Sequence, residues 1–369
     1  MIGGHTDSPN LKVKPKSKRN ASGHTMLGVE CYGGGLWHTW FDRDLSVSGR
    51  VLVQKKADKA AAAAGGGGRK SVKTEQRLVN LKDPIARIST LCIHLQSAEE
   101  RKGFSVNKEN HTSPIIATTT TERSIQSKEN DAAKESLEKG AQEQLNATTG
   151  SSSSKWRDAQ EPLLLEAIAE KLGVEQDEIV DFELNLYDTQ AASLGGITKE
   201  FLYSARLDNL ATVFCAMEAL VDYTTAADDD DAASFKDSGD VSLAVVFDHE
   251  EVGSTSAQGA GSPVMASAVE RIAAALNGGG SLNPDLYNAC IRKSFILSID
   301  QAHAIHPNYA AKHEAQHAPT LNSGIVIKTN SNQRYATNGI TGFVVRELGR
   351  IADVPVQEFV VRNDCPCGR

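Results

Sequence analysis

The sequence lacks several features that define broad classes of protein. Basic residues are outnumbered, 39 against 47 acidic ones, and the formal net charge is −8. A chain without a basic field has little attraction for nucleic acid, so we expect no nucleic-acid partner. No run of 18 apolar residues occurs, and the opening MIGGHTDSPN has neither a basic nor an apolar segment. We therefore expect no membrane span or membrane partner, no secretory signal, and a cytoplasmic location, with the vacuole as the alternative.

Closely spaced cysteines are also scarce. Six cysteines are scattered over 369 residues, and only Cys365 and Cys367 lie close together, spaced C-x-C. One such pair is weak evidence for a zinc knuckle, and the pattern favours reduced thiols over disulfides. The glycine-rich stretches lack the G-x-G-x-x-G spacing between strand and helix, which argues against a dinucleotide site.

The remaining composition is that of an ordinary globular protein. Hydrophobic residues make up 40% and charged residues 23% of a chain that is long enough for two domains. Three tracts interrupt the regular patterns, and we expect flexible insertions or solvated loops at residues 57–70, 118–155 and 224–240.

Hydrophobic periodicity differs between the two halves of the chain. The first half is mostly strand-like, as at residues 49–54 and 179–188. After residue 200, helical patterns alternate with short apolar runs, which predicts a helix-covered sheet of the α/β class with a buried strand at residues 243–247. In such sheets, active groups gather beyond the carboxyl ends of the strands.

Carboxylates recur at these predicted ends. Glu250 and Glu251 follow the strand at 243–247, Asp300 follows an apolar run, and Asp208 precedes a helix that begins at Leu210. Each has an ordinary explanation when taken singly, because Asp208 or Asn209 would serve as a helix N-cap and the others as the polar start of a turn or solvated loop.

A histidine near the start of the sequence indicates that these carboxylates bind a metal together. His5 and Asp7 form an H-x-D arrangement, in which the carboxylate can orient a metal-binding imidazole. Imidazole and carboxylate oxygens suit zinc, with manganese or cobalt as substitutes. A bridging carboxylate such as Asp208 would hold two ions about 3.5–4 Å apart, and Glu250 would then be the general base.

Seven motifs together resemble the aspartyl aminopeptidase (M18) family of dinuclear zinc metallopeptidases: GGHTDSP, YGGGLWHTWFDRDL, SARLDNL, FDHEEVGS, SIDQAHAIHPNY, NSNQRYATN and VRNDCPCG. The resemblance implies an α/β metallopeptidase domain at residues 1–10 and 196–369, with an inserted, mostly β dimerisation domain at residues 11–195. It also implies a tetrahedral homododecamer that removes N-terminal Asp or Glu from peptides and binds two Zn²⁺ ions per subunit.

The resemblance extends to single residues of the predicted centre. His5 matches a terminal zinc ligand, Asp208 the bridging ligand, and Glu251 and Asp300 further ligands. Glu250 matches the general base, and we place Asp7 beside it in the catalytic set as the carboxylate that orients His5.

A second group matches the family's substrate pocket. Lys328 resembles the residue that reads the substrate's side-chain carboxylate, with Tyr335 and His303 nearby. His94 resembles a histidine that reaches a neighbouring subunit's active site. His303 and His306, spaced i and i+3, could instead be metal ligands themselves, and a preference for neutral residues stays open because one lysine does not establish acidic selectivity.

The chain departs from the family pattern at both ends. Family members carry a further N-terminal region and continue past NDCPCG to an MHS-type motif whose histidine is the last zinc ligand. Two hypotheses follow from this difference. The chain is a metalloaminopeptidase, or it is a truncated, catalytically inactive relative that acts only as an oligomer-perturbing subunit or is a gene-model fragment.

Overall fold

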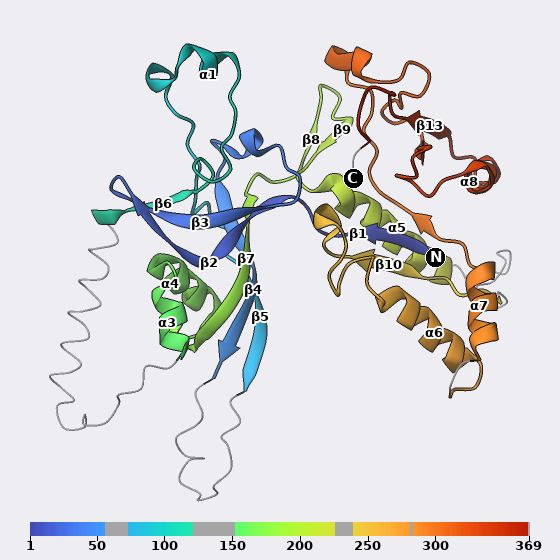
Figure 1. The fold of residues 1–369 in the computed structure, drawn as a ribbon, viewed down its shortest axis with the longest axis horizontal. Helices are drawn as coiled ribbons and strands as arrows, with labels where there is room; N and C mark the ends of the chain where they lie inside the picture. The colour runs from blue at the N-terminus through green and yellow to red at the C-terminus, as the bar shows by residue number, and fades with distance from the viewer. Residues whose placement is uncertain (56–72, 121–151, 226–238, 281–282, 368–369) are drawn as a thin grey trace, which may run out of the picture. The chain divides into compact units, whose positions relative to one another are not determined.

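The computed structural model describes residues 1–55, 73–120, 152–225, 239–280 and 283–367 (Figure 1). The chain forms two compact units, which are unit 1, Met1–Asp7 with Arg206–Arg369, and unit 2, Ser8–Ala205. The tract at 57–70 lies outside the described residues, as does most of the tracts at 118–155 and 224–240. All six cysteines are free thiols. Within the described residues, no helix is both long and apolar enough to span a membrane.

Unit 2 is built on a six-stranded antiparallel sheet in the order β5-β4-β7-β2-β3-β6. Its strands are β2 (Asn10–Ala21), β3 (His24–Tyr32), β4 (Leu45–Gln54), β5 (Thr74–Asn80), β6 (Ile115–Thr118) and β7 (Ile179–Asp188). Inward-facing leucines and valines alternate along β4 and β7, so one face of each strand enters a common core. A separate hairpin, β8 (Ser193–Gly195) with β9 (Phe201–Tyr203), follows this sheet in the chain.

Two helices complete the core of unit 2. These are α3 (Ser152–Asp158) and α4 (Pro162–Leu172), while the short α1 (Ala98–Lys102) buries no side chain. The first turn of α4 has Pro162 after a Glu161 cap, and the helix ends at Gly173 in the left-handed conformation. Residues 152–155, at the end of the tract that was expected to be flexible, belong to α3, which contacts β7.

Unit 1 contains two short parallel sheets. One has the order β10-β1-β11, with β1 (Ile2–His5) in the middle, β10 (Ala244–Phe247) and β11 (Leu297–Ser298). The other pairs β12 (Ile325–Thr329) with β13 (Val356–Val360). The helices are α5 (Leu207–Thr225), α6 (Val264–Leu276), α7 (Pro284–Lys293) and α8 (Gly339–Ile351), with the 3-10 turns η7 (Glu250–Val252) and η8 (Pro307–Lys312).

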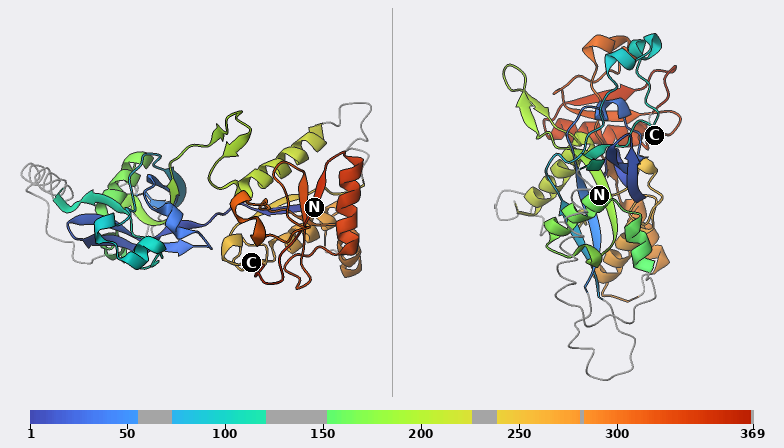
Figure 2. Two further views of the ribbon diagram at one scale, coloured as in Figure 1. Left: turned by 90° about the horizontal axis from the view of Figure 1, so that it is seen from above. Right: turned by 90° about the vertical axis from the view of Figure 1, so that its left-hand side faces the viewer.

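Helix α5 runs alongside β1 and β10 (Figure 1 and Figure 2). The predicted alternation of helices and strands after residue 200, and with it the α/β class, is confirmed. Full burial of the strand at 243–247 is not found, because β10 pairs only with β1 among the described strands and Val246 stays 43% exposed. An edge strand with one covered side leaves alternate side chains in contact with solvent.

Candidate metal centre

The end of β1 delivers His5 to the carboxyl edge of the sheet. His5 is the last residue of this middle strand and pairs with Phe247, the last residue of β10. The residue is buried, with 5% of its surface exposed. The segments that leave β10 and β11 at the same edge carry Glu250 and Asp300. The strand order therefore brings together groups that are separated by about 300 positions in the sequence.

The start of α5 is tied to this edge by Asn209. The fully buried Asn209 side chain donates a hydrogen bond from Nδ2 to the Ile299 carbonyl at 2.9 Å. Gly4 permits the close approach, since an added Cβ would lie 3.3 Å from both Asn209 Nδ2 and Val213 Cγ2. Asn209 thus joins the helix to a strand end, and its neighbour Asp208 faces His5.

Three side chains could hold a metal ion together. Asp208 Oδ1 and Asp300 Oδ1 each lie 3.5 Å from His5 Nε2. One ligand atom from each of these residues lies within 4.8 Å of the others. Glu250 Oε2 is 3.9 Å from the same imidazole nitrogen. An imidazole nitrogen and hard carboxylate oxygens form a donor set that fits zinc, manganese or cobalt.

Asp7 supports this arrangement from behind. Its Oδ1 lies 3.3 Å from His5 Nδ1, on the side of the ring that faces away from Asp208. Its two carboxylate oxygens accept hydrogen bonds from the backbone N–H groups of Glu250 and Glu251, both at 3.1 Å. Asp7 therefore both orients the imidazole and holds the turn that follows β10.

The local backbone places the two glutamates side by side. His249 occupies the left-handed region with φ 64°, directly before η7, and its Nδ1 lies 2.6 Å from Ser256 Oγ. Asp248 Oδ1 accepts from the His249 N–H at 2.8 Å. This tight turn reverses the chain immediately after β10, which leaves Glu250 and Glu251 at the edge of the sheet.

The carboxylates shift one another's protonation. Hydrogen bonds with Asp300 and Asp7 raise the pKa of His5 to about 10. Burial raises the pKa of Glu251 to about 7, helped by the charge of Glu250, and burial also raises the pKa of Glu250. Burial together with the charge of Asp300 raises the pKa of Asp208 to about 6. A centre that must hold protons to limit its negative charge is one that a divalent cation would stabilise.

Lys328 supplies positive charge at the opposite side of Asp300. Its Nζ lies 3.1 Å from Asp300 Oδ2 and donates to the Gln301 carbonyl at 2.7 Å. The same ammonium lies 5.8 Å from the centroid of the Tyr335 ring. Burial lowers the pKa of His303, and nearby His313 and Lys328 lower it further. The structure thus brings the predicted pocket residues Lys328, Tyr335 and His303 together in unit 1.

The predicted histidines outside the metal centre have further contacts of their own. His303 packs against Phe359, with ring centroids 4.8 Å apart. His306 caps η8 by accepting from the Asn308 N–H. Among the described residues, neither histidine belongs to a group of side chains that could hold a metal. His94 lies exposed in the 3-10 turn Ile93–Leu95 of unit 2.

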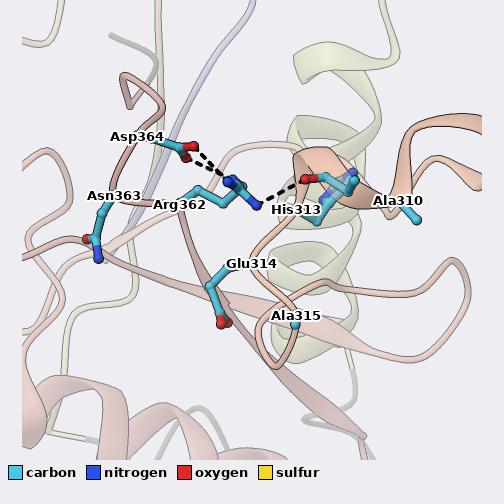
Figure 3. Close-up of a pocket in the computed structure, with 8 residues that line it drawn as sticks. Ala310, His313, Glu314, Ala315, Arg362, Asn363 and Asp364 are labelled. Atoms are coloured by element: carbon cyan, nitrogen blue, oxygen red, sulfur yellow. Dashed lines mark hydrogen bonds and ion pairs between the residues drawn. The ribbon is translucent and has the colours of Figure 1, made fainter.

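Sequence reasoning missed one feature near this pocket. A recess of about 520 Å³ lies beside η8 (Figure 3), and it is lined by Ala310, Ala311, His313, Glu314, Ala315, Arg362, Asn363 and Asp364. Arg362 donates to both carboxylate oxygens of Asp364, at 2.8 and 2.6 Å, and to the Ala311 carbonyl at 3.1 Å. The motif VRNDCPCG contains Arg362 and Asp364, but nothing local in it indicates that Arg362 contacts η8.

Comparison with known proteins gives the same assignment over the whole chain. The family model Peptidase M18, aminopeptidase I zinc metalloprotease, matches residues 1–369. A probable aspartyl aminopeptidase of Ricinus communis is 45% identical over 369 residues, which cover all of this chain and 70% of that protein.

Solved structures agree with the sequence relatives. A chain in the Ape4 and Nbr1 complex has a TM-score of 0.77 at 39% identity, and the match covers all of this chain and 61% of that one. The mApe1 dodecamer of S. cerevisiae has a TM-score of 0.70 at 26% identity, covering 98% of this chain and 67% of that one. The chain therefore spans roughly two thirds of these proteins, and it belongs to the Peptidase M18 family of aminopeptidase I zinc metalloproteases.

Proposed function

We propose that this chain is a metalloaminopeptidase that removes N-terminal Asp or Glu from peptides. The observation that carries the proposal is the convergence of His5, Asp208 and Asp300 at one sheet edge, with Glu250 beside them. When bound, two zinc ions, held by these residues and Glu251, would supply Lewis acidity for the scissile carbonyl and lower the pKa of the attacking water.

The chain's own residues carry the remaining chemistry. Glu250 accepts a proton from the attacking water, and its raised pKa brings it closer to the working range of a general base at neutral pH. Asp7 contacts the His5 ring and accepts a hydrogen bond from the Glu250 N–H, so it fixes the position of both relative to each other. Lys328 pairs with the side-chain carboxylate of the substrate, which would otherwise be desolvated without a partner.

The assembly follows from the relatives as a proposal. The solved mApe1 structure of S. cerevisiae is a dodecamer, which supports the same assembly for this chain. In such an oligomer, we propose that His94 of one copy contributes to the substrate pocket of another.

The decisive test is Glu250→Gln, which removes the proton acceptor and keeps the shape of the side chain. We expect unchanged zinc content and a loss of at least about a thousandfold in kcat on an Asp-linked substrate. Glu218→Gln, at an exposed position of α5, is the matched control and should retain full turnover. If the Glu250→Gln variant still turns over substrate, Glu250 is not the general base. If the unaltered, zinc-loaded chain shows no turnover, the hypothesis of a catalytically inactive relative is favoured.

Acidic selectivity has its own test in Lys328→Met. Removing the ammonium should lower kcat/KM for Asp-linked substrates by about a hundredfold and leave Leu-linked substrates nearly unchanged. The ratio of the two kcat/KM values is the measurement. If the ratio does not change, Lys328 does not determine the selectivity, and the alternative of a preference for neutral residues is favoured.

A further inference from the structure

Lys328 contacts the candidate metal centre as well as the predicted substrate pocket. Its ammonium has three N–H donors. Two are directed at Asp300 Oδ2 and the Gln301 carbonyl, at 3.1 and 2.7 Å. The Lys328 side chain is 17% exposed, so this charge is held in place rather than free in solvent.

Asp300 is the residue that both functions share. Its Oδ1 lies 3.5 Å from His5 Nε2, on the side of the three-residue metal-holding group, and its Oδ2 lies 3.1 Å from Lys328 Nζ. The two oxygens of one carboxylate thus face two different cations. Asp300 is therefore placed to pair with either cation.

We propose that Lys328 is shared between Asp300 and the acidic side chain of the substrate, so that metal binding and binding of an acidic residue strengthen each other. Without an acidic ligand, the ammonium neutralises Asp300 and repels a metal cation at the same carboxylate. When a substrate carboxylate accepts hydrogen bonds from Lys328, the ammonium no longer neutralises Asp300, and Asp300 attracts the metal with its full negative charge. Linkage is reciprocal, so the metal raises the affinity for acidic residues by the same factor. This inference rests on the proposed function of the site.

Metal affinity measured without turnover tests the first half of the proposal. The full chain is stripped of metal with a chelator and titrated with Co²⁺, whose visible absorption reports binding. We expect Lys328→Met to bind Co²⁺ about tenfold more tightly than the unaltered chain, because one opposing charge is gone. Lys293→Met removes an exposed charge from α7 of the same unit and should change the affinity less than about twofold. Weaker binding by Lys328→Met would mean that Lys328 only orients Asp300, and it would overturn the proposal.

The second half is tested by repeating the titrations with L-aspartate or L-leucine present. Chelation of free Co²⁺ by an amino acid is the same for both proteins, so the difference between them isolates Lys328. We expect L-aspartate to tighten Co²⁺ binding at least about fivefold more in the unaltered chain than in Lys328→Met, with no such difference for L-leucine. Equal effects on both proteins would overturn the linkage.

Lys328→Arg guards against a variant that fails to fold. It keeps the positive charge, so its Co²⁺ affinity should stay close to that of the unaltered chain, and a tenfold gain would contradict the charge argument. The outcomes are also separable from those of the proposed function. If the Co²⁺ affinities shift as expected but the chain hydrolyses no peptide, the shared lysine is supported and the peptidase function is overturned. If the chain hydrolyses Asp-linked substrates normally but the Co²⁺ affinities do not shift, the peptidase function is supported and the shared lysine is overturned.

Discussion

At the scale of single residues, the protonation of His5 governs the charge of the candidate centre. The imidazole is buried beside Asp7, Asp208, Asp300 and Glu250, and its pKa is raised to about 10. In the metal-free chain at neutral pH, His5 is therefore a cation that partly takes the place of the metal. A metal must displace this proton, because only the neutral imidazole is a ligand.

The metal-free chain should lose stability as pH rises. The folded pKa of His5 lies above its ordinary value of 6.5, so its contribution is complete below pH 6.5 and is lost as pH approaches 10. The raised pKa values of Asp208, from 3.8 to about 6, and of Glu251, from 4.5 to about 7, give a decline of the same sign at lower pH, and this decline is largely complete by pH 7. We expect a decline of about 1–2 kcal/mol between pH 7 and pH 10, allowing for solvent screening by the half-exposed partners.

Urea unfolding in the presence of a chelator, at several pH values, measures this decline. His5→Gln should remove the part above pH 7, since glutamine has no proton to lose. A decline of equal size in His5→Gln would show that other groups dominate.

At the scale of elements, the fit between β1 and α5 positions the centre. Gly4 lets the helix start approach the strand so closely that Asn209 reaches the Ile299 carbonyl. Asp208 is attached to that same helix start and contacts His5. The spacing between strand and helix thus sets the distance between two candidate ligands.

Gly4→Ala should push α5 away from the strand. The added methyl would lie 3.3 Å from Asn209 Nδ2 and Val213 Cγ2 and 3.4 Å from the Ile299 carbonyl, so we expect destabilisation of about 1–3 kcal/mol and weaker zinc binding. Gly339→Ala in α8 meets nothing within 4 Å and should be neutral or slightly stabilising. Urea unfolding and zinc titration of both variants check this. If Gly4→Ala has the stability and the zinc affinity of the unaltered chain, the start of α5 accommodates the added methyl group and its close approach to β1 is not required.

The sequence predicted elements better than contacts. Periodicity located α5, α6, α8 and the strands β4 and β7, because each has a regular apolar face of its own. Exposure of β10 could not be predicted, because burial depends on which strand lies beside it. Residue type and strand ends indicated the carboxylates. The hydrogen bonds from Glu250 and Glu251 to Asp7 span more than 240 positions, and the Lys328–Asp300 pair spans 28, so no local pattern encodes them.

At the scale of the whole molecule, unit 1 exposes many large apolar side chains. They include Phe214 at 63%, Leu276 at 73%, Ile340 at 78% and Phe343 at 58% exposed. Apolar side chains exposed in this number are available for contacts between copies of a chain that associates.

We expect the purified chain to form a defined oligomer rather than a monomer, as the proposed assembly requires. Sedimentation equilibrium or light scattering should give a single species of about twelve times the mass of one chain. Phe343→Ser in α8 should shift the population to smaller species if that face takes part in assembly, and the fully exposed Ile197→Ser in unit 2 is the comparison. A monodisperse monomer would contradict the proposed dodecamer.

The position of β1 in the chain also affects how the protein is made. This strand is the middle of its sheet and precedes unit 2, yet its partners β10 and β11 begin at residues 244 and 297. On the ribosome, all of unit 2 emerges and can fold before β1 has a neighbour to pair with. Strand β1, which carries His5, therefore has no partner until β10 has been translated, and its sheet is complete only after translation has passed Ser298.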